Sequence, residues 1–285
     1  MGTVRAATEL TVATWNTQGK ARPAMLALLN EVRPDVLFVQ EVRMTTWLTL
    51  LASSDWSGAF GLNLRPRQEG EGGKRALGAA ILVRSPMTLL DASVITHDGF
   101  AWPERGVTGL VTPAEGGESI RLVAYHALHG GHGTIKPATS QALGYWLSKQ
   151  TGRVLVGMDA NSPWVDHPDE SRMEACWEQH PVLHATTMGM ERALLGPRGD
   201  RKHDLADVWR TFLGTHEEQA EAIRAASPDG PLATTHYTGR GLNREPRRYD
   251  HLWATDDFRV LDVKHMEEGF AAGSDHALVV ARLGY

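Results

Sequence analysis

Short apolar runs rich in Val, Ile and Leu set the strongest limit on what this 285-residue chain can fold into. Such runs, bounded by turn-forming residues, are typical of strands, and segments with a helical spacing of apolar residues lie between some of them. This order predicts an α/β protein whose mixed sheets are covered by helices. The predicted strands lie at residues 10–15, 36–39, 78–83, 107–111, 120–125, 154–158, 251–254 and 277–281, and the predicted helical segments at residues 24–32 and 142–147.

The chain shows no internal repeat, low-complexity tract or Pro/Ser-rich linker. Its length and ordinary apolar content therefore favour one large domain, a sandwich spanning residues 1–285. The loosest stretches are residues 65–75, 162–204 and 227–248. Segments of that length between core elements are more often functional surface than core.

The formal charge is −5, from 29 Lys and Arg against 34 Asp and Glu, so no global positive field recruits nucleic acid. A polyanionic substrate therefore needs a local basic patch. Cys176 is the only cysteine, which excludes an intramolecular disulfide and a multi-cysteine zinc site. We expect a cytoplasmic protein because no signal-like or membrane-spanning apolar run is seen, and export by another route stays open.

Several predicted strands end in a carboxylate, carboxamide or imidazole side chain rather than in turn residues alone. If these strands share sheets, their ends converge on one site. Taken singly, each such residue is more often a turn or cap residue, so the interpretation depends on their joint appearance. The residues are Asn16, Glu41, His126, Asp159, Asn161, Asp250, Asp275 and His276.

The oxygen-bearing members of this set suit a metal ion and a bound water. Mg²⁺ takes oxygen ligands, usually one or two carboxylates with a substrate phosphate, so Glu41 is a natural ligand and Asn16 can complete the polar shell. Asp159 and Asn161 lie two residues apart on an extended segment and therefore point the same way. Together they can orient an attacking water and the phosphate.

The histidines suit the negative charge that develops on a phosphate during hydrolysis. Imidazole groups such as His126 and His276 can donate hydrogen bonds or protons to phosphoryl oxygens. A carboxylate such as Asp250 can fix the tautomer and orientation of one of them.

In this chain order, the motifs resemble those of the endonuclease/exonuclease/phosphatase superfamily, which has the DNase-I-like fold. The similarity covers nearly the whole chain, from Thr11 to Leu283. Residues 207–210, Asp-Val-Trp-Arg, are similar to a further family element that we interpret as structural support. The main matching motifs are Trp15-Asn16, Gln40-Glu41, Gly78-Ala79-Ala80-Ile81-Leu82, Asp159-Ala160-Asn161 and Ser274-Asp275-His276.

The resemblance implies a four-layer α/β sandwich of two mixed, mainly antiparallel sheets flanked by helices. It also implies a Mg²⁺ cofactor, with Mn²⁺ as an alternative. The implied metal residues are Glu41, Asn16 and Asp275, and the implied catalytic residues are Asp159, Asn161, Asp250 and His276.

A mid-chain histidine completes the set that the resemblance implies. Residues 125–131, Tyr-His-Ala-Leu-His-Gly-Gly, are similar to a sequence segment in the nuclease subunit of cytolethal distending toxins. This similarity favours His126 as the catalytic histidine, with His129 as the alternative. Tyr125 is a third candidate, because a tyrosine near this place serves the abasic-site endonuclease branch. Nuclease relatives often place a glutamate before the strand at 78–83 to pair with the histidine, but here residues 75–77 are Arg-Ala-Leu.

The loops indicate the class of substrate. Arginines cluster just before Asp250, where they place positive charge along the path of a nucleic-acid backbone. Trp164 can stack on a sugar or base, and it lies within residues 162–204, which we interpret as a branch-specific insertion. The predicted substrate-binding residues are Arg75, Arg244, Arg247, Arg248 and Trp164.

The sequence therefore predicts a metal-dependent phosphodiesterase, with a DNA endonuclease favoured. The first alternative is a phosphatase or phospholipid phosphodiesterase with the same site, and the second is a non-catalytic binding scaffold. No basic amphipathic helix or apolar hairpin favours a membrane substrate. The polar strand ends are all present, which argues against a degenerate scaffold. The sequence indicates no protein partner, and we expect a monomer.

Overall fold

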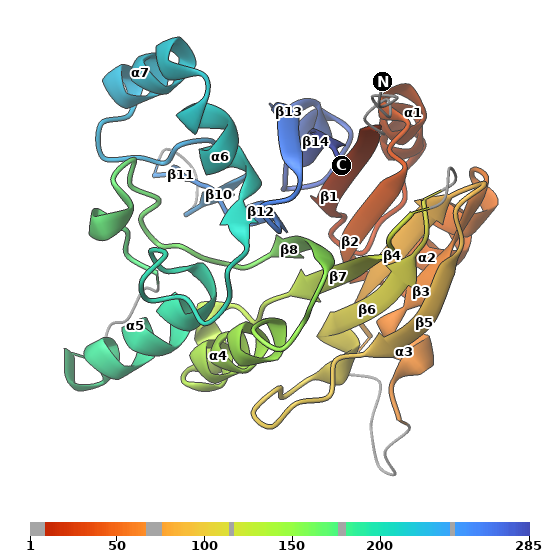
Figure 1. Ribbon diagram of the computed structural model, residues 1–285, viewed down its shortest axis with the longest axis horizontal. Coiled ribbons are helices and arrows are strands. Elements are labelled where there is room, and N and C mark those ends of the chain that lie inside the picture. The colour runs from red at the N-terminus through yellow and green to blue at the C-terminus, as the bar shows by residue number, and fades with distance from the viewer. Residues whose placement is uncertain (1–8, 67–75, 114–116, 176–180, 240–242) are drawn as a thin grey trace, which may run out of the picture.

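Two six-stranded sheets form the centre of the molecule (Figure 1). The computed structural model describes residues 9–66, 76–113, 117–175, 181–239 and 243–285. In the first sheet, one parallel pair of strands is flanked by antiparallel neighbours. The strands of this sheet, in spatial order, are β13 (Arg259–Met266), β14 (Leu278–Gly284), β1 (Glu9–Asn16), β2 (Val36–Val42), β4 (Gly78–Arg84) and β3 (Trp56–Phe60), with β1 and β2 parallel.

The second sheet repeats this arrangement around another parallel pair. A separate two-stranded hairpin of β10 (His236–Thr238) and β11 (Glu245–Arg247) lies outside both large sheets. The strands of the second sheet, in spatial order, are β5 (Leu89–Val94), β6 (Gly106–Val111), β7 (Ile120–His126), β8 (Arg153–Asp159), β12 (Asp250–Ala254) and β9 (Ala206–Asp207), with β7 and β8 parallel.

The central strands are buried on both faces, because successive side chains of a strand point to opposite sides of the sheet. Val12 and Phe38 of the first sheet share one buried cluster with Leu122 and Leu155 of the second. This cluster fills the space between the sheets. The next residue after Val12, Ala13, belongs to a different cluster on the outer face.

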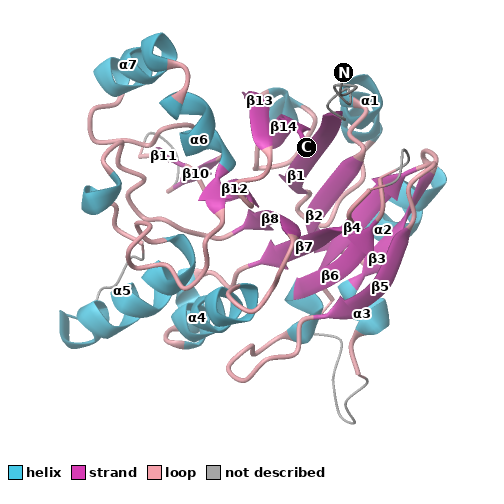
Figure 2. Cartoon of the chain, viewed as in Figure 1, coloured by secondary structure: helices cyan, strands magenta, loops and turns pink. Residues whose placement is uncertain are grey.

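Helices cover the outer face of each sheet (Figures 1 and 2). α1 (Pro23–Val32) and α2 (Met44–Ala52) cover the first sheet, where Leu28 joins the outer cluster. α4 (Ile135–Leu147) covers the second sheet through Leu143. The order helix, sheet, sheet, helix confirms the predicted α/β sandwich of two mixed, mainly antiparallel sheets.

All four edge strands of the two large sheets, β3, β5, β9 and β13, are absent from the sequence prediction. Each lies at the edge of its sheet and carries exposed or half-buried residues, so it lacks a continuous apolar run. The remaining helices are α3 (Gly61–Leu64), α5 (Pro181–Leu195), α6 (Val208–Gly214), α7 (Glu217–Ala226) and α8 (Glu268–Ala271), with short 3-10 turns η1 (Pro103–Arg105), η2 (Gly130–His132) and η3 (Glu170–Arg172).

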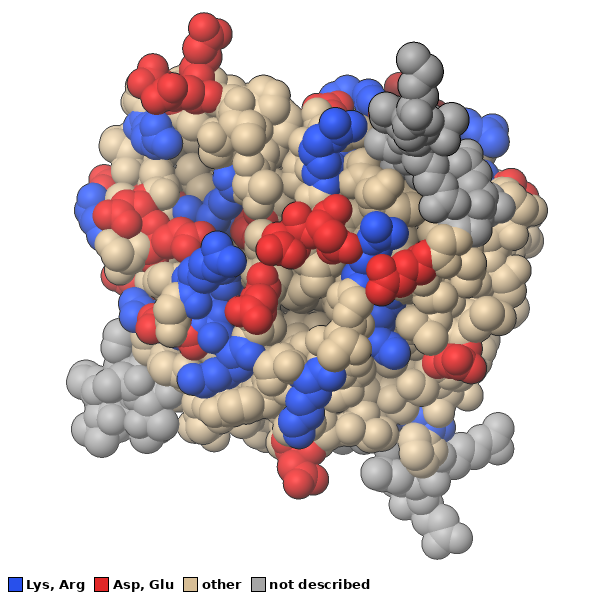
Figure 3. Space-filling model, in the orientation of Figure 1, with Lys and Arg blue, Asp and Glu red and all other residues tan. Residues whose placement is uncertain are grey.

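Acidic and basic side chains are interspersed on the face shown in Figure 3, which agrees with the small net charge. Within the described parts of the chain, none of the helices has the length and apolar character needed to cross a membrane.

Arg248, which the sequence predicts to bind substrate, is buried instead, and that prediction is wrong. Its side chain is 2% exposed. The guanidinium donates from Nε to Asp166 Oδ2 at 2.6 Å and from Nη2 to Asp207 Oδ2 at 2.8 Å. Asp207 also accepts backbone N–H bonds at the start of α6, in agreement with a structural role of residues 207–210. Two buried carboxylates therefore hold this arginine inside the fold.

Residues 162–204 are anchored to α4 by a buried ion pair. Lys136 Nζ of α4 lies 3.0 Å from Glu191 Oε1 of α5. Ser162 Oγ accepts a hydrogen bond from Lys136 at 2.6 Å and donates one to Glu191 at 3.2 Å. Since Ser162 directly follows Asn161, the pair also fixes the loop that leaves β8. The origin of this segment as an insertion stays a prediction.

We expect Arg248→Ala to lower the free energy of unfolding by about 3–5 kcal/mol, because buried Asp207 would lose its arginine partner and buried Asp166 would keep only Arg210. Denaturant unfolding followed by tryptophan fluorescence measures the change. Arg244→Ala is the matched control, since Arg244 is exposed and its loss should change the free energy of unfolding by less than about 0.5 kcal/mol. Small effects of both substitutions would contradict the structural role of Arg248.

Candidate active site

The strand ends of both sheets bring polar side chains to one place. Because β1 and β2 are parallel, Asn16 and Glu41 lie at the same end of the first sheet. In the second sheet, His126 of β7 and Asp250 of β12 both pair in register with Asp159 of β8. The strand ends therefore converge at the edge where the two sheets meet.

Asp159 lies at the centre of this group and is almost fully buried. Its carboxylate accepts hydrogen bonds from the Asn16 side chain at 2.7 Å and from the Asn161 backbone N–H at 2.9 Å. The Nε2 atoms of His126 and His276 lie 3.7 and 3.9 Å from its Oδ2 atom. Burial raises the pKa of Asp159, but His276 and His126 outweigh it and lower the pKa below the ordinary value. The carboxylate is therefore ionised at neutral pH.

His276 is buried beside carboxylates and stays protonated at neutral pH. Its Nδ1 atom lies 2.7 Å from Asp250 Oδ2. Burial lowers the pKa of the imidazole, but Asp250 and Asp159 outweigh it and raise the pKa to about 10. The ring of His236 stacks on His276 with centroids 4.4 Å apart, and its Nδ1 atom lies 3.0 Å from the Asp275 carbonyl. His276 therefore carries a positive charge, and its ring is held in place by Asp250 and His236.

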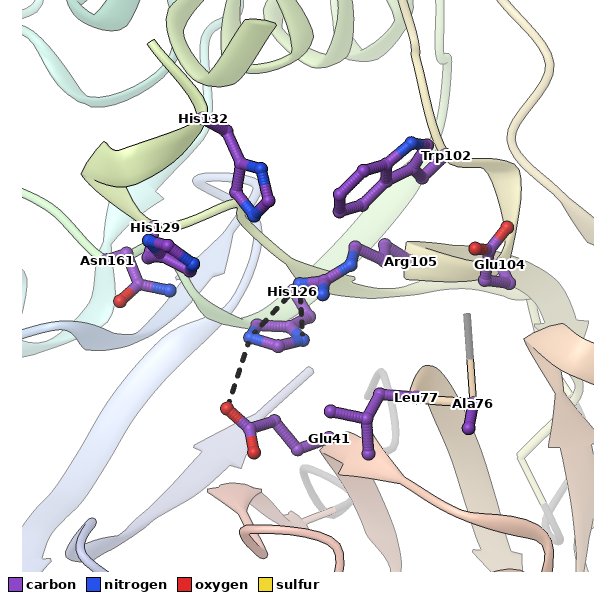
Figure 4. A pocket seen from close by; sticks show the side chains of 10 residues that line it. All are labelled: Glu41, Ala76, Leu77, Trp102, Glu104, Arg105, His126, His129, His132 and Asn161. Atoms are coloured by element: carbon purple, nitrogen blue, oxygen red, sulfur yellow. Dashed lines mark hydrogen bonds and ion pairs between the residues drawn. The ribbon is translucent and has the colours of Figure 1, made fainter. Parts of the chain in front are cut away.

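His126, in contrast, is neutral. Arg105 Nη1 lies 2.9 Å from His126 Nδ1, and because arginine only donates, Nδ1 accepts this bond. The ring proton is then on Nε2, which lies 3.7 Å from Glu41 Oε1 (Figure 4). Burial and then the charge of Arg105 lower the pKa of His126 to about 3. The two histidines of the site therefore differ in charge.

Glu41 and its neighbours offer an oxygen-rich donor set that fits a hard divalent cation. Burial, and then the charge of Asp159, raise the pKa of Glu41, and Asp275 adds to this effect. Negative charges crowded together in this way are relieved by a bound cation. The backbone φ of Glu41 is 54°, a left-handed conformation that is costly for a non-glycine residue and typical of functional sites. Glu41, Asn16 and Asp275 are the residues that fit Mg²⁺.

Two groupings of His and carboxylate among the described residues bring possible ligand atoms within 4.8 Å of one another. One contains His236, Asp275 and His276, and the other contains Asp159, Asp250 and His276. Both depend on His276, whose Nδ1 atom is already engaged by Asp250. Because Mg²⁺ prefers oxygen ligands, the carboxylates around Glu41 match it better than these histidine networks.

The structure places every predicted catalytic and metal residue in or beside this centre. Asn161 lines the pocket there, and its side-chain amide donates to the Ala127 carbonyl at 3.1 Å. His129 lies on the pocket wall, whereas Tyr125 is fully buried in the core, so Tyr125 cannot take the place of the catalytic histidine. Arg75 lies outside the described residues.

The other predicted substrate residues lie on a neighbouring surface. The guanidinium carbon of Arg247 lies 3.9 Å from the centroid of the Trp164 ring. Arg247 also pairs with His236 across the β10–β11 hairpin, and His236 stacks on His276. Arg244 is exposed just before β11. A surface of arginine and aromatic side chains, in which Arg247 is also ion-paired with Glu245, therefore flanks the group around Asp159 on the hairpin side.

Four residues of the site were not predicted from the sequence. Arg105 lies against His126, Trp102 and His132 line the same pocket, and His236 supports His276. Arg105 directly precedes the strand at 106–111, but a charged residue there is common in turns, so the sequence offers little signal. The other three lie in a loop, in the 3-10 turn η2 and in a short hairpin, where position along the chain says little about position in space.

We expect Asp250→Asn to lower the pKa of His276 from about 10 toward about 6.5, because the buried imidazolium loses its closest carboxylate. Since folding raises this pKa, the stability that the proton contributes is fully present below about pH 6.5 and is lost as the pH rises through about 10. NMR titration of the imidazole, with unfolding curves across this pH range, measures both effects. The exposed His216 serves as the control residue for the titration. An unchanged His276 pKa in the variant would contradict the assignment.

Solved structures resemble the chain over nearly its whole length. D. rerio TDP2 complexed with a single strand DNA product has a TM-score of 0.63 at 15% identity, covering 98% of this chain and 100% of that chain. ANGEL2, a 2',3'-cyclic phosphatase, has a TM-score of 0.64 at 14% identity, covering 98% and 95%. The human Nocturnin catalytic domain with bound sulfate has a TM-score of 0.56 at 16% identity, covering 96% and 94%. At these identities the likeness shows the fold alone.

No curated protein sequence matches the chain. The model of the Endonuclease/Exonuclease/phosphatase family matches residues 13–276, a range that contains every strand-end residue from Asn16 to His276. The chain therefore belongs to the endonuclease/exonuclease/phosphatase family.

Proposed function

We propose that this protein is a Mg²⁺-dependent phosphodiesterase that cuts DNA internally. Family membership supports the broader class, a hydrolase of phosphate esters. The observation that carries the proposal is the meeting of Glu41, Asp159 and two histidines of different charge at one sheet edge. A metal site, a water-orienting carboxylate and donors for a charged phosphate are the parts that phosphodiester hydrolysis requires.

Asp159 is the residue that orients the attacking water. It is ionised, and hydrogen bonds from Asn16 and from the Asn161 backbone hold its carboxylate in place. A carboxylate fixed in this way can accept a proton from water in the transition state. A Mg²⁺ ion held by Glu41, with Asn16 and Asp275 nearby, supplies positive charge to the phosphate when bound.

The two histidines stabilise the phosphate in different ways, one as a charged donor and the other as a neutral donor. His276, kept protonated by Asp250, can donate a charged hydrogen bond or a proton where negative charge develops. His126 is neutral, and its Nε2 proton points toward the space between Glu41 and Asp159. It can therefore donate a hydrogen bond to a phosphoryl oxygen, but it does not act as an imidazolium acid at neutral pH. Arg105 lies beside His126 and adds a permanent positive charge.

DNA is the favoured substrate because a cationic and aromatic surface adjoins the catalytic histidine. Arg247 and Trp164 form a cation–π pair next to His236, and Arg244 extends the positive charge. Such a surface suits a phosphate backbone with bases that stack on aromatic rings. The DNA product named in the D. rerio TDP2 structure is consistent with this choice, since that protein shares the fold.

The test is relaxation of supercoiled plasmid by the purified protein in Mg²⁺. We expect nicking that EDTA abolishes, and a loss of about 10²-fold or more in Glu41→Ala and about 10²–10⁴-fold in His276→Ala. Circular dichroism should show that both variants fold. Retained activity in Glu41→Ala would refute the metal assignment.

The same experiment separates the alternative functions. Hydrolysis of a generic phosphomonoester or a phospholipid headgroup, with the plasmid left intact, would support the proposed active site. It would contradict DNA as the substrate. A folded protein that is inactive on every phosphate ester in Mg²⁺ and in Mn²⁺ would favour the binding scaffold.

We expect Arg247→Ala to weaken DNA binding at low salt and to reduce the slope of log affinity against log salt by about 1, because one phosphate contact is lost. Fluorescence anisotropy of labelled DNA at several salt concentrations measures the slope. Arg282→Ala is the matched control, since Arg282 is an exposed arginine of β14 that pairs with Glu9. Equal slopes in Arg247→Ala and the wild-type protein would place the DNA elsewhere.

A further inference from the structure

A cavity of about 350 Å³ opens beside the proposed catalytic centre, and none of its lining residues belongs to the β10–β11 hairpin (Figure 4). Glu41, His126 and Asn161 form its catalytic side. Its volume falls in the range of small-molecule sites and matches one nucleotide unit better than a stretch of duplex. The remaining lining residues are Ala76, Leu77, Trp102, Glu104, Arg105, His129 and His132.

Three aromatic rings form the wall of this cavity that lies farthest from Glu41 in Figure 4, and we call them the ring wall: Trp102, His129 and His132. The Trp102 and His132 rings meet edge to face with centroids 4.8 Å apart. His129 and His132 are 4.3 Å apart and come from adjoining positions at η2. Rings contributed by two separate loops therefore face one cavity.

The His132 ring of the ring wall is uncharged near neutral pH. Burial, and then the charges of His129 and Arg105, lower the pKa of His132. Neutral imidazole and indole rings offer π surfaces on which any base can stack. Leu77 and Ala76 add apolar surface on the opposite side of the cavity.

Arg105 connects the ring wall with the reacting phosphate. Its guanidinium carbon lies 5.0 Å from the centroid of the Trp102 ring, while its Nη1 atom donates to His126. Among the described residues, no carboxylate lies within 4.0 Å of this cation. A half-buried arginine without a close counter-ion suits an anionic group of the substrate. Arg105 thus lies between His126 and the ring wall, so one nucleotide could place its phosphate near the cation and its base against the rings.

Resting on the nuclease function proposed above, we infer that the ring wall binds one unpaired nucleobase next to the scissile phosphate. A base stacked within a duplex cannot reach the cavity, so the substrate is single-stranded or locally opened DNA. Trp102 is then a specificity-determining residue, and the Trp164 surface on the hairpin side takes the continuing strand.

The experiment uses single-stranded oligothymidylate that carries one abasic residue at a defined position, and cleavage at each bond is resolved by gel. At one bond, the residue that should place its base in the cavity is the abasic one. The wild-type protein should cut this bond about 5- to 150-fold less than the other bonds. Trp102→Ala should cut all bonds at the lower rate and should no longer distinguish the abasic position. Trp102→Phe should restore the discrimination, because it restores an aromatic ring.

Circular dichroism reports whether each variant is folded, because Trp102→Ala is expected to cut every bond of the oligonucleotide more slowly. Tyr145→Ala, which removes an exposed ring on α4, is the matched control and should behave as the wild-type protein. Cleavage that skips no bond in the wild-type protein would overturn the inference while leaving the nuclease function intact. Failure to cut any oligonucleotide would overturn the nuclease function, and the inference with it.

Discussion

The hydrogen bond between Asn16 and Asp159 joins the two sheets at the edge where the active site lies. A carboxylate that is 1% exposed is costly unless hydrogen bonds and positive charges compensate for the lost water. Asp159 meets this requirement with Asn16, its own loop backbone and two histidines. The strand register that supplies these partners is therefore tied to the chemistry of the site. Any shift between the sheets would leave this carboxylate without compensation.

Buried charges elsewhere in the protein are paired in a different way. Arg248 lies between Asp166 and Asp207, and Lys136 lies against Glu191, so each cation has a carboxylate within 3.0 Å. Such pairs maintain the positions of segments and have no unused capacity for a ligand. Around Glu41 and Arg105 the pairing is incomplete: carboxylates crowd on one side, and on the other Arg105 has no carboxylate within 4.0 Å in the part of the chain that the structure describes. In the proposed function, a metal ion and a phosphate complete this pairing.

The histidines show how one residue type takes two roles through its surroundings. His276 has Asp250 at 2.7 Å and is an imidazolium, whereas His126 has Arg105 at 2.9 Å and is neutral. Glu41 and Asp159 also lie 3.7 Å from His126, but burial and the charge of Arg105 outweigh them and keep the ring neutral. The contact between Arg105 and His126 could not be predicted from the sequence, because the two residues lie 21 positions apart on different elements. In the proposed function, His276 is therefore the charged donor to the phosphate.

The sequence by itself determined the sandwich and the set of strand-end residues. Buried strands need apolar runs, and polar residues such as Asn16, Glu41 and Asp159 that interrupt those runs at strand ends are visible in one dimension. The sequence did not predict the edge strands or the role of Arg248. The exposure of a side chain and its partners depend on which elements pack against it. The ring wall, the pairing of Arg105 with His126 and the charge states of the histidines were decided only by tertiary structure. Each depends on burial and on distances of a few ångströms between residues from separate loops, which spacing along the chain does not encode.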